Sequence, residues 1–360
     1  LVIDGDFNTD VTGDLTVANA KTIAQATSGT VDFTGTITDA ALAFSAANGT
    51  IEADFTAVRD GGGDSAVNIV VNNAVNAAQG KTIAQATTGT VDFSAGLSDT
   101  MANLLNGVQN AVNANLTAAA NNDGDPNVNV TVASGTLNVA KLNLIKGATT
   151  GTITASIDGT ANALTNLNTV GTDAITMTVD AGTAAAADLT TIDGKTSVAV
   201  AANAVTKITG SDTEVRAALT ADGNGTLVID GDFTTDVSGN VTVTNANTIV
   251  AATTGQVDFT GTITDSMANM LNGGETAIST AFAAVTNGTS SSDGDGGVAV
   301  TVNAGTLTVT KLNLIKAAST GTITASISGT ANALAGLNTQ GDDAITMTVD
   351  AGTAAAADLT

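Results

Sequence analysis

The sequence predicts an all-β fold, an elongated parallel β-solenoid (β-helix) repeat array with short capped helical turns. Three observations predict it: blocks of sequence recur along the chain, short runs alternate apolar and hydroxyl residues, and aromatic residues make up only 2% of the 360 residues. A large globular core normally uses aromatic side chains to fill its volume. We therefore expect many thin layers packed from Val, Ile, Leu and Ala.

The repeats are long and nearly identical. Residues 1–39 align without a gap to 227–265, and residues 141–190 recur at 311–360 with 43 of 50 positions identical. Blocks that are duplicated or dropped without damage contact mainly their neighbours, as in a linear stack. This pattern gives two segments within one continuous array: a full repeat period at 1–226, and a second, shortened copy at 227–360.

Alternating runs at 152–157, 175–179 and 241–244 place apolar residues on one face and hydroxyls on the other. This pattern is typical of half-buried strands. Gly-Thr pairs precede many such runs, and we expect each Gly to supply the corner between successive strands.

Short helices are predicted between the strands. Residues 98–107 and 264–273 each begin with a capping residue and end with Gly, and Ser211 and Glu214 have the spacing of a capping box. One coil is then a strand, a turn, a strand and often a small helix. Tandem β-sandwich modules remain the alternative, because short strands with regular turns also suit them.

Composition excludes several function classes. The chain has no His or Cys, which removes disulfides, thiolate catalysis and the commonest general base. Its net charge of −24, from 34 acidic and 10 basic residues, argues against nucleic acid and anionic membranes as partners. No apolar run approaches the roughly 20 residues of a membrane-spanning helix, so we expect no membrane insertion.

Three motifs carry a resemblance to known proteins: AADLTTIDGKTSVAV at 186–200, VTKITGSDTEVRAAL at 205–219, and the LVIDGDF strands. They resemble the repeats of very long bacterial surface and secreted proteins, notably cyanobacterial ones, described as adhesin-like or haemolysin-like. The resemblance implies an extracellular or cell-surface location and a structural or adhesive role, often with calcium. It implies no catalytic residues, and the tandem calcium-binding nonapeptide of repeat-in-toxin proteins is missing.

Asp-Gly-Asp triplets are the candidate calcium ligands, because adjacent carboxylates on a turn can begin a shell of oxygen ligands. The better candidates lie in loops, at Asp123 and Asp125 and at Asp293 and Asp295. The weaker candidates lie in predicted strands: Asp4, Asp6, Asp230 and Asp232. Asp and Gly are also ordinary turn formers on a solvated corner, and this interpretation stays open.

The repeated motif KLNLIK contains the pairs Lys141/Lys146 and Lys311/Lys316. These lysines are expected to neutralise nearby Asp residues and protect a strand edge. Covalent isopeptide links from these lysines to Asn or Asp, as in some surface adhesins, are the alternative.

The function expected from the sequence is that of an extracellular structural protein, not an enzyme. Open sheet edges at both ends would pair copies of the chain head to tail into a fibre, sheath or surface layer, with Leu1 to Phe7 a candidate strand donor. One alternative is the stalk of a large adhesin, with cell-surface polysaccharide as a further partner. A polysaccharide-active enzyme is a minor alternative, since no pair of carboxylates stands out for that chemistry.

Overall fold

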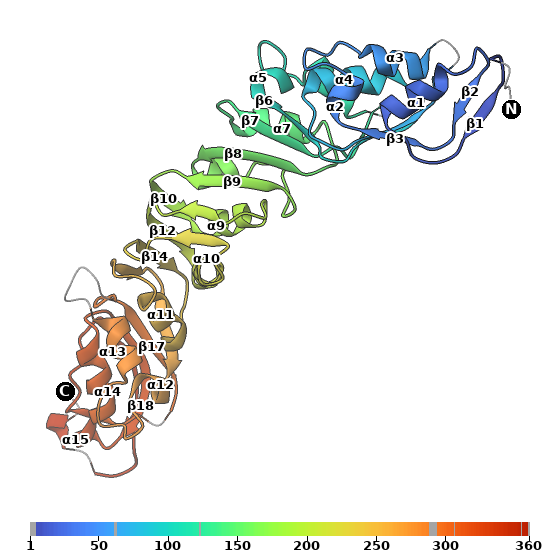
Figure 1. Ribbon diagram of the computed structural model, residues 1–360. Helices are drawn as coiled ribbons and strands as arrows, with labels where there is room; N and C mark the ends of the chain where they lie inside the picture. Colours follow the sequence, from blue (N-terminus) through green and yellow to red (C-terminus); the bar gives the residue numbers. More distant parts are fainter. Residues whose placement is uncertain are drawn as a thin grey trace. The chain divides into compact units, whose positions relative to one another are not determined.

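The structure of the protein is a computed structural model that describes residues 5–60, 63–121, 124–287, 294–305, 307–353 and 355–358. It forms two compact units (Figure 1). The first comprises Leu1–Gly159, Asn166–Thr178 and Gly194–Val198, and the second comprises Thr160–Thr165, Val179–Asp193 and Ala199–Thr360.

The first unit alternates short strands with helices along the chain. Its elements are β1 (Thr9–Val11), α1 (Val17–Ala24), β2 (Val31–Phe33), β3 (Thr36–Asp39), α2 (Ala41–Phe44), α3 (Ala53–Arg59), β4 (Asn68–Val71), α4 (Ala77–Ala86), β5 (Val91–Phe93), β6 (Leu97–Thr100), α5 (Met101–Leu104), α6 (Ala114–Ala119), β7 (Val130–Ser134), α7 (Val139–Lys146), β8 (Ile153–Gly159) and most of β9 (Ala174–Val179).

Its strands form parallel pairs: β1 with β2, β4 between β3 and β5, and β7 between β6 and β8. The separation of paired residues in the sequence ranges from 22 positions, as for Thr9 and Val31, to 34 positions, as for Thr100 and Ser134. Parallel neighbours need a crossover connection, which a helix usually provides. The helices also pack on one another, α1 on α3 and α4 on α6.

The second unit repeats this arrangement. Its elements are α8 (Ala161–Leu164), β10 (Gly182–Ala185), α9 (Ala186–Asp193), β11 (Val200–Ala202), β12 (Val205–Ser211), α10 (Asp212–Gly223), β13 (Leu227–Ile229), β14 (Thr234–Ser238), α11 (Val243–Val250), β15 (Val257–Phe259), β16 (Thr262–Ser266), α12 (Met267–Met270), α13 (Thr280–Thr286), β17 (Ala299–Ala304), α14 (Val309–Ala318), β18 (Ile323–Gly329), α15 (Ala331–Leu334), β19 (Ala344–Val349) and the 3-10 helix η1 (Ala356–Asp358).

Its strands are also parallel. One sheet has the order β10-β12-β14-β15 and another the order β16-β17-β18-β19, while β11 pairs with β13. Helices α9 and α10 pack together, as do α11 and α13.

The prediction of an all-β parallel β-solenoid is wrong, and so is the β-sandwich alternative. The structure is mixed α/β, with 31% helix and 28% strand, several parallel sheets and 15 α-helices in its described part. The prediction fails because apolar residues three or four positions apart, such as Val17, Ala20 and Ala24, form buried helix faces. Ala18 and Lys21, which lie between them, favour a helix.

The run at 241–244 shows the same error at one site. It alternates Val and Thr like a strand, but Thr242 is the N-cap of α11 and its hydroxyl accepts from the N–H of Asn245 at 3.3 Å. Val243, Ala246 and Ile249 then form the buried face of the helix. A side-chain cap and a three-residue apolar spacing therefore outweigh the β propensity of Val and Thr.

Other local predictions are confirmed. The runs at 152–157 and 175–179 lie in β8 and β9, with alternate residues buried. Ser211 and Glu214 form the expected reciprocal capping box at the start of α10. The segments at 98–107 and 264–273 each contain one helical turn, α5 and α12, but their first residues belong to the preceding strands β6 and β16.

The core is built mainly from Val, Ile, Leu and Ala, as expected, but the few aromatic residues concentrate in it. Seven of the eight Phe side chains are buried, and the rings of Phe44 and Phe55 pack edge to face at 5.0 Å. A small number of large side chains thus fills the space between helices and sheets.

Candidate functional site

The predicted calcium ligands lie in different environments. Asp4, Asp123 and Asp293 fall outside the described residues. Asp6, Asp230 and Asp232 are exposed. No group of three or more His, Cys, Asp or Glu side chains is arranged to hold a metal ion in the described ranges, so calcium stays a prediction.

The two described loop candidates both stabilise turns. Asp125 accepts a hydrogen bond from the N–H of Asn127 at 3.0 Å, and Asp295 accepts one from the N–H of Gly297 at 2.8 Å. Asp125 also accepts from the N–H of Phe93 at 3.3 Å. These bonds have the spacing of Asx turns, in which Asp stabilises the backbone two residues further on.

Asp295 also belongs to an acidic neighbourhood in the second unit. Burial raises the pKa of Asp258, and repulsion from Asp295 and from Asp236 raises it further, while Lys207 opposes the rise. Lys207 forms an ion pair with Asp236 at 2.6 Å. An open hollow of about 420 Å³ lies beside Asp295, lined in part by Gln256 and Thr320.

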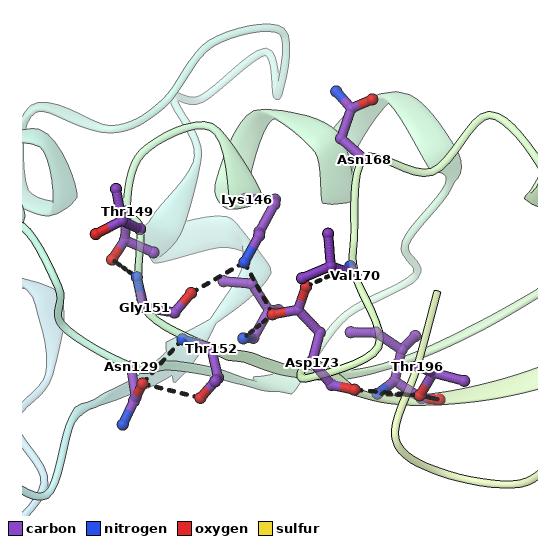
Figure 2. A network of polar contacts seen from close by, with 12 residues as sticks. Asn129, Lys146, Thr149, Gly151, Thr152, Asn168, Val170, Asp173 and Thr196 are labelled. Carbon is purple, nitrogen blue, oxygen red and sulfur yellow. Dashed lines mark hydrogen bonds and ion pairs between the residues drawn. The ribbon is translucent and has the colours of Figure 1, made fainter. Parts of the chain in front are cut away.

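The repeated lysines form two buried ion pairs. Figure 2 shows the first, in which Lys146 Nζ lies 2.9 Å from Asp173 Oδ1 and donates to the Gly151 carbonyl at 3.0 Å. The backbone N–H groups of Ile153 and Val170 donate to the same carboxylate at 2.7 and 2.8 Å. The pair therefore joins the end of α7, the start of β8 and the loop before β9.

The second copy reproduces the arrangement. Lys316 Nζ lies 3.0 Å from Asp343 Oδ1 and donates to the Gly321 carbonyl at 3.1 Å. Burial opposes ionisation of Asp343, but hydrogen bonds from the N–H groups of Gln340 and Ile323 and from Lys316 outweigh it and lower the pKa of Asp343. The lowered pKa of Asp343 keeps its carboxyl ionised, which favours an ion pair with Lys316 over an isopeptide link between them, because direct amide formation needs a neutral acid and a neutral amine.

The expected neutralisation of Asp is present for Lys146 and Lys316. The expected protection of a strand edge is wrong. Lys141 and Lys146 lie on helix α7, and Lys311 and Lys316 lie on α14. Lys311 pairs with Glu275 at 2.5 Å.

A recurring buried hydroxyl, which we call the latch hydroxyl, ties successive strands together. In the clearest example, Thr149 Oγ1 donates to the Val128 carbonyl at 2.6 Å and accepts from the N–H of Gly151 at 2.9 Å. Each latch hydroxyl is buried and donates to a carbonyl 20 or 21 residues earlier; the six described latches are Thr27, Thr87, Thr149, Thr196, Thr253 and Ser319.

The glycines that lie two positions after a latch hydroxyl do not have the role predicted for them, which was to form the corner between successive strands. A Cβ at Gly151 would lie 2.3 Å from the carbonyl oxygen of Asn127, and one at Gly29 would lie 2.3 Å from that of Phe7. These positions need Gly because the backbone of the preceding strand approaches closely, and not because of a left-handed conformation.

Three aspartates cap helices that begin 22 residues before them. Asp39, Asp99 and Asp265 accept from the first N–H groups of α1, α4 and α11, at Val17, Ala77 and Val243, over 3.1, 3.0 and 3.0 Å. Asp99 and Asp265 lie within the segments 98–107 and 264–273 that were predicted to be helical, yet their side chains cap helices that begin earlier in the chain. The shared spacing of 22 residues was the available signal, but only the folded chain shows which helix each carboxylate meets.

Strand β19 is the most distinctive surface. Its sequence, Ala-Ile-Thr-Met-Thr-Val, is identical to that of β9. Met177 and Val179 of β9 are 0% and 1% exposed, whereas Met347 and Val349 of β19 are 55% and 49% exposed. Within the described residues, β19 pairs with a single strand, β18. The same apolar face is therefore covered in one copy and open in the other.

Strand β1 shows the corresponding difference in the first unit. Its residues Thr9 to Val11 match Thr235 to Val237 of β14. In β14, which pairs on both sides, Thr235 and Val237 are buried. In β1, which pairs only with β2 in the described part of the chain, Thr9 and Val11 are half-buried.

No family model matches the chain, and comparisons with curated proteins and with solved structures give no match. Among the described residues, no helix is long and apolar enough to cross a membrane.

Proposed function

We propose that the protein is an extracellular structural protein whose copies associate end to end into a fibre, sheath or surface layer. The observation that carries the proposal is the repetition of parallel-stranded blocks along the chain, with 43 of 50 positions identical between 141–190 and 311–360. Blocks that contact mainly their neighbours can continue from one copy of the chain to the next. Contacts between unlike ends that do not close into a ring produce filaments.

The composition supports the same role. The chain is acidic, lacks His and Cys, and repeats its blocks almost unchanged, as suits a protein selected for a repeating architecture rather than for one reactive centre. The most conspicuous polar networks, the latches and the Lys-Asp pairs, bond the chain to itself.

Electron microscopy of the purified chain, in calcium and again after chelation, tests the proposal. We expect filaments with a regular axial repeat, and their loss on chelation would locate calcium at the contacts. Separate particles under all conditions would contradict end-to-end assembly and favour the stalk of an adhesin.

A further inference from the structure

We propose that a polar hollow in the first unit is a binding site for a neutral sugar ring. The hollow is lined by the first residues of α4 and α6, by the end of β6, by α5 and by the loop after α2. A sugar site here goes beyond the structural role of the protein and does not require the chain to form filaments.

The size of the hollow suits one sugar ring. Its volume is about 170 Å³. At a share of about 30 Å³ for each water molecule, this is room for about five waters. The small side chains of Ala47, Ala77 and Ala78 leave this space open. One sugar ring, with its several hydroxyl groups, is comparable in size to such a cluster of waters and can replace their hydrogen bonds.

Four asparagines supply most of the polar groups of the hollow: Asn76, Asn103, Asn113 and Asn115. A side-chain amide has two N–H donors and one carbonyl acceptor. Asn103 Nδ2 donates to Asp99 Oδ1 at 2.7 Å, and Asn103 Oδ1 accepts no bond within the described residues. The backbone N–H of Asn115 donates to Asn113 Oδ1 at 2.9 Å, but the Asn115 side chain makes no hydrogen bond to any described residue. Free donors and free acceptors therefore line the same hollow.

The charge of the hollow favours a neutral ligand. Among the described residues that line it, Asp99 alone is ionisable. Its carboxylate accepts from the N–H groups of Ala77 at 3.0 Å and Thr100 at 2.8 Å, and from Asn103. Because Asp99 already caps α4 and the described lining includes neither Lys nor Arg, an anion is disfavoured. A hydroxyl group, which both donates and accepts, matches the free amide groups.

The second unit shows that helix capping does not require all of these amides. Asp99 and Asn103 recur there as Asp265 and Asn269, which are joined by the same hydrogen bond at 2.7 Å. At the positions of the other three asparagines, the second unit has Thr242, Ser279 and Ala281. Thr242 and Ser279 still cap α11 and α13 with their hydroxyl groups. Capping therefore accounts for Asp99 and Asn103, but it does not account for the amide of Asn115.

The test titrates the full chain with D-glucose, D-galactose and N-acetyl-D-glucosamine and follows the side-chain amide signals by NMR. We expect at least one of these sugars to shift the signals of Asn103 and Asn115 in a saturable way. The dissociation constant should be on the order of 1 mM, because the described lining has no aromatic ring to add apolar contact with the sugar.

Three variants localise the binding. Asn115→Ala, which copies Ala281 of the second unit, should weaken binding by about fivefold, the effect of one typical hydrogen bond. Ala78→Thr, which copies Thr244, should also weaken binding, because it fills part of the hollow without removing an amide. Asn19→Ala changes an exposed asparagine of α1 that does not line the hollow, and it should leave binding unchanged. The melting temperatures of the three variants should stay close to that of the unchanged chain.

Several outcomes would overturn the proposal. One is the absence of a saturable shift with all three sugars. Another is equally tight binding of glycerol, which has hydroxyl groups but no ring. A third is equal weakening of binding by Asn115→Ala and Asn19→Ala. Sugar binding by a chain that stays as separate particles would uphold the sugar site and reject self-assembly, so the two proposals fail separately.

Discussion

At the scale of single residues, the buried pair of Lys316 and Asp343 depends on both partners. The side chains are 7% and 0% exposed, so removing one partner leaves an unpaired buried charge. Such a loss costs about 3–5 kcal/mol, whereas replacing both partners by apolar residues is often nearly neutral.

We therefore expect Lys316→Met to lower the free energy of unfolding by about 3–5 kcal/mol, measured by urea denaturation. The double variant Lys316→Met with Asp343→Leu should recover part of this loss. Because the pKa of Asp343 is lowered in the fold, its contribution is present above the unfolded pKa of about 4 and declines as the pH falls through the folded value. A single-variant cost that persists unchanged at pH 2 would contradict this account.

Ionisation of Asp258 is expected to have the opposite effect on the free energy of unfolding from ionisation of Asp343. Its pKa is raised by burial and by two neighbouring carboxylates, so ionisation of Asp258 disfavours the folded state. Asp258→Asn should raise the melting temperature at pH 7, and the gain should disappear as the pH falls below the folded pKa. The variant Asp158→Ser, which copies Ser328 of the second repeat at an exposed position, is the control and should have little effect at either pH.

The latch hydroxyls should contribute through hydrogen bonding and not through shape. Thr149→Val keeps the side-chain volume but leaves the Val128 carbonyl and the Gly151 N–H without their partner. We expect a loss of about 1–3 kcal/mol in the free energy of unfolding. Thr149→Ser, which reproduces Ser319 of the second copy, should cost less than half of this. Equal losses in the two variants would show that the methyl group, and not the hydroxyl, is responsible.

At the scale of elements, helix caps come from side chains far away in the sequence. Asp265 accepts from the N–H of Val243 at the start of α11, and also from Ser266 and Asn269. Asp265→Ala should lower the free energy of unfolding by about 1–3 kcal/mol, because it removes a charged acceptor from a helix N-terminus.

Hydrogen exchange locates the effect of Asp265→Ala. Amides in the first turn of α11 should exchange faster in this variant, while those of α10, which has its own capping box, should not change. Faster exchange confined to α12, the helix that follows Asp265 in sequence, would contradict the assignment.

At the scale of the whole molecule, charge is the dominant feature. The net charge is −24, so the excess carboxylates repel one another within the folded chain and between copies of it. Raising the ionic strength from about 0.01 to 0.15 M shortens the Debye length from about 30 to 8 Å, so the melting temperature should rise with salt. Calcium bound at specific sites would raise it further than magnesium at equal ionic strength. If the melting temperature depends in the same way on calcium and on magnesium, general screening of charge explains the effect and specific calcium sites do not.

Some features of the structure depend only on residues that are close together in the sequence, and these features can be predicted from the sequence. The strands at 152–157 and 175–179 follow from alternation, and the capping box of Ser211 and Glu214 follows from a spacing of three residues. The apolar, aromatic-poor composition correctly indicated the residue types of the core. Each of these features depends on neighbours within a few positions.

Most of the remaining features depend on contacts between residues that are 20 or more positions apart. The strand-like run at 241–244 is helical because Asp265 and Thr242 cap it, and Asp173 meets Lys146 only when two strands and a helix come together. The identical strands β9 and β19 give the clearest case, since their sequence is the same but their burial differs. The sequence by itself determined which strands and latches can form. Only the tertiary structure decided which of them are covered, because burial depends on the neighbouring strand and not on the strand itself.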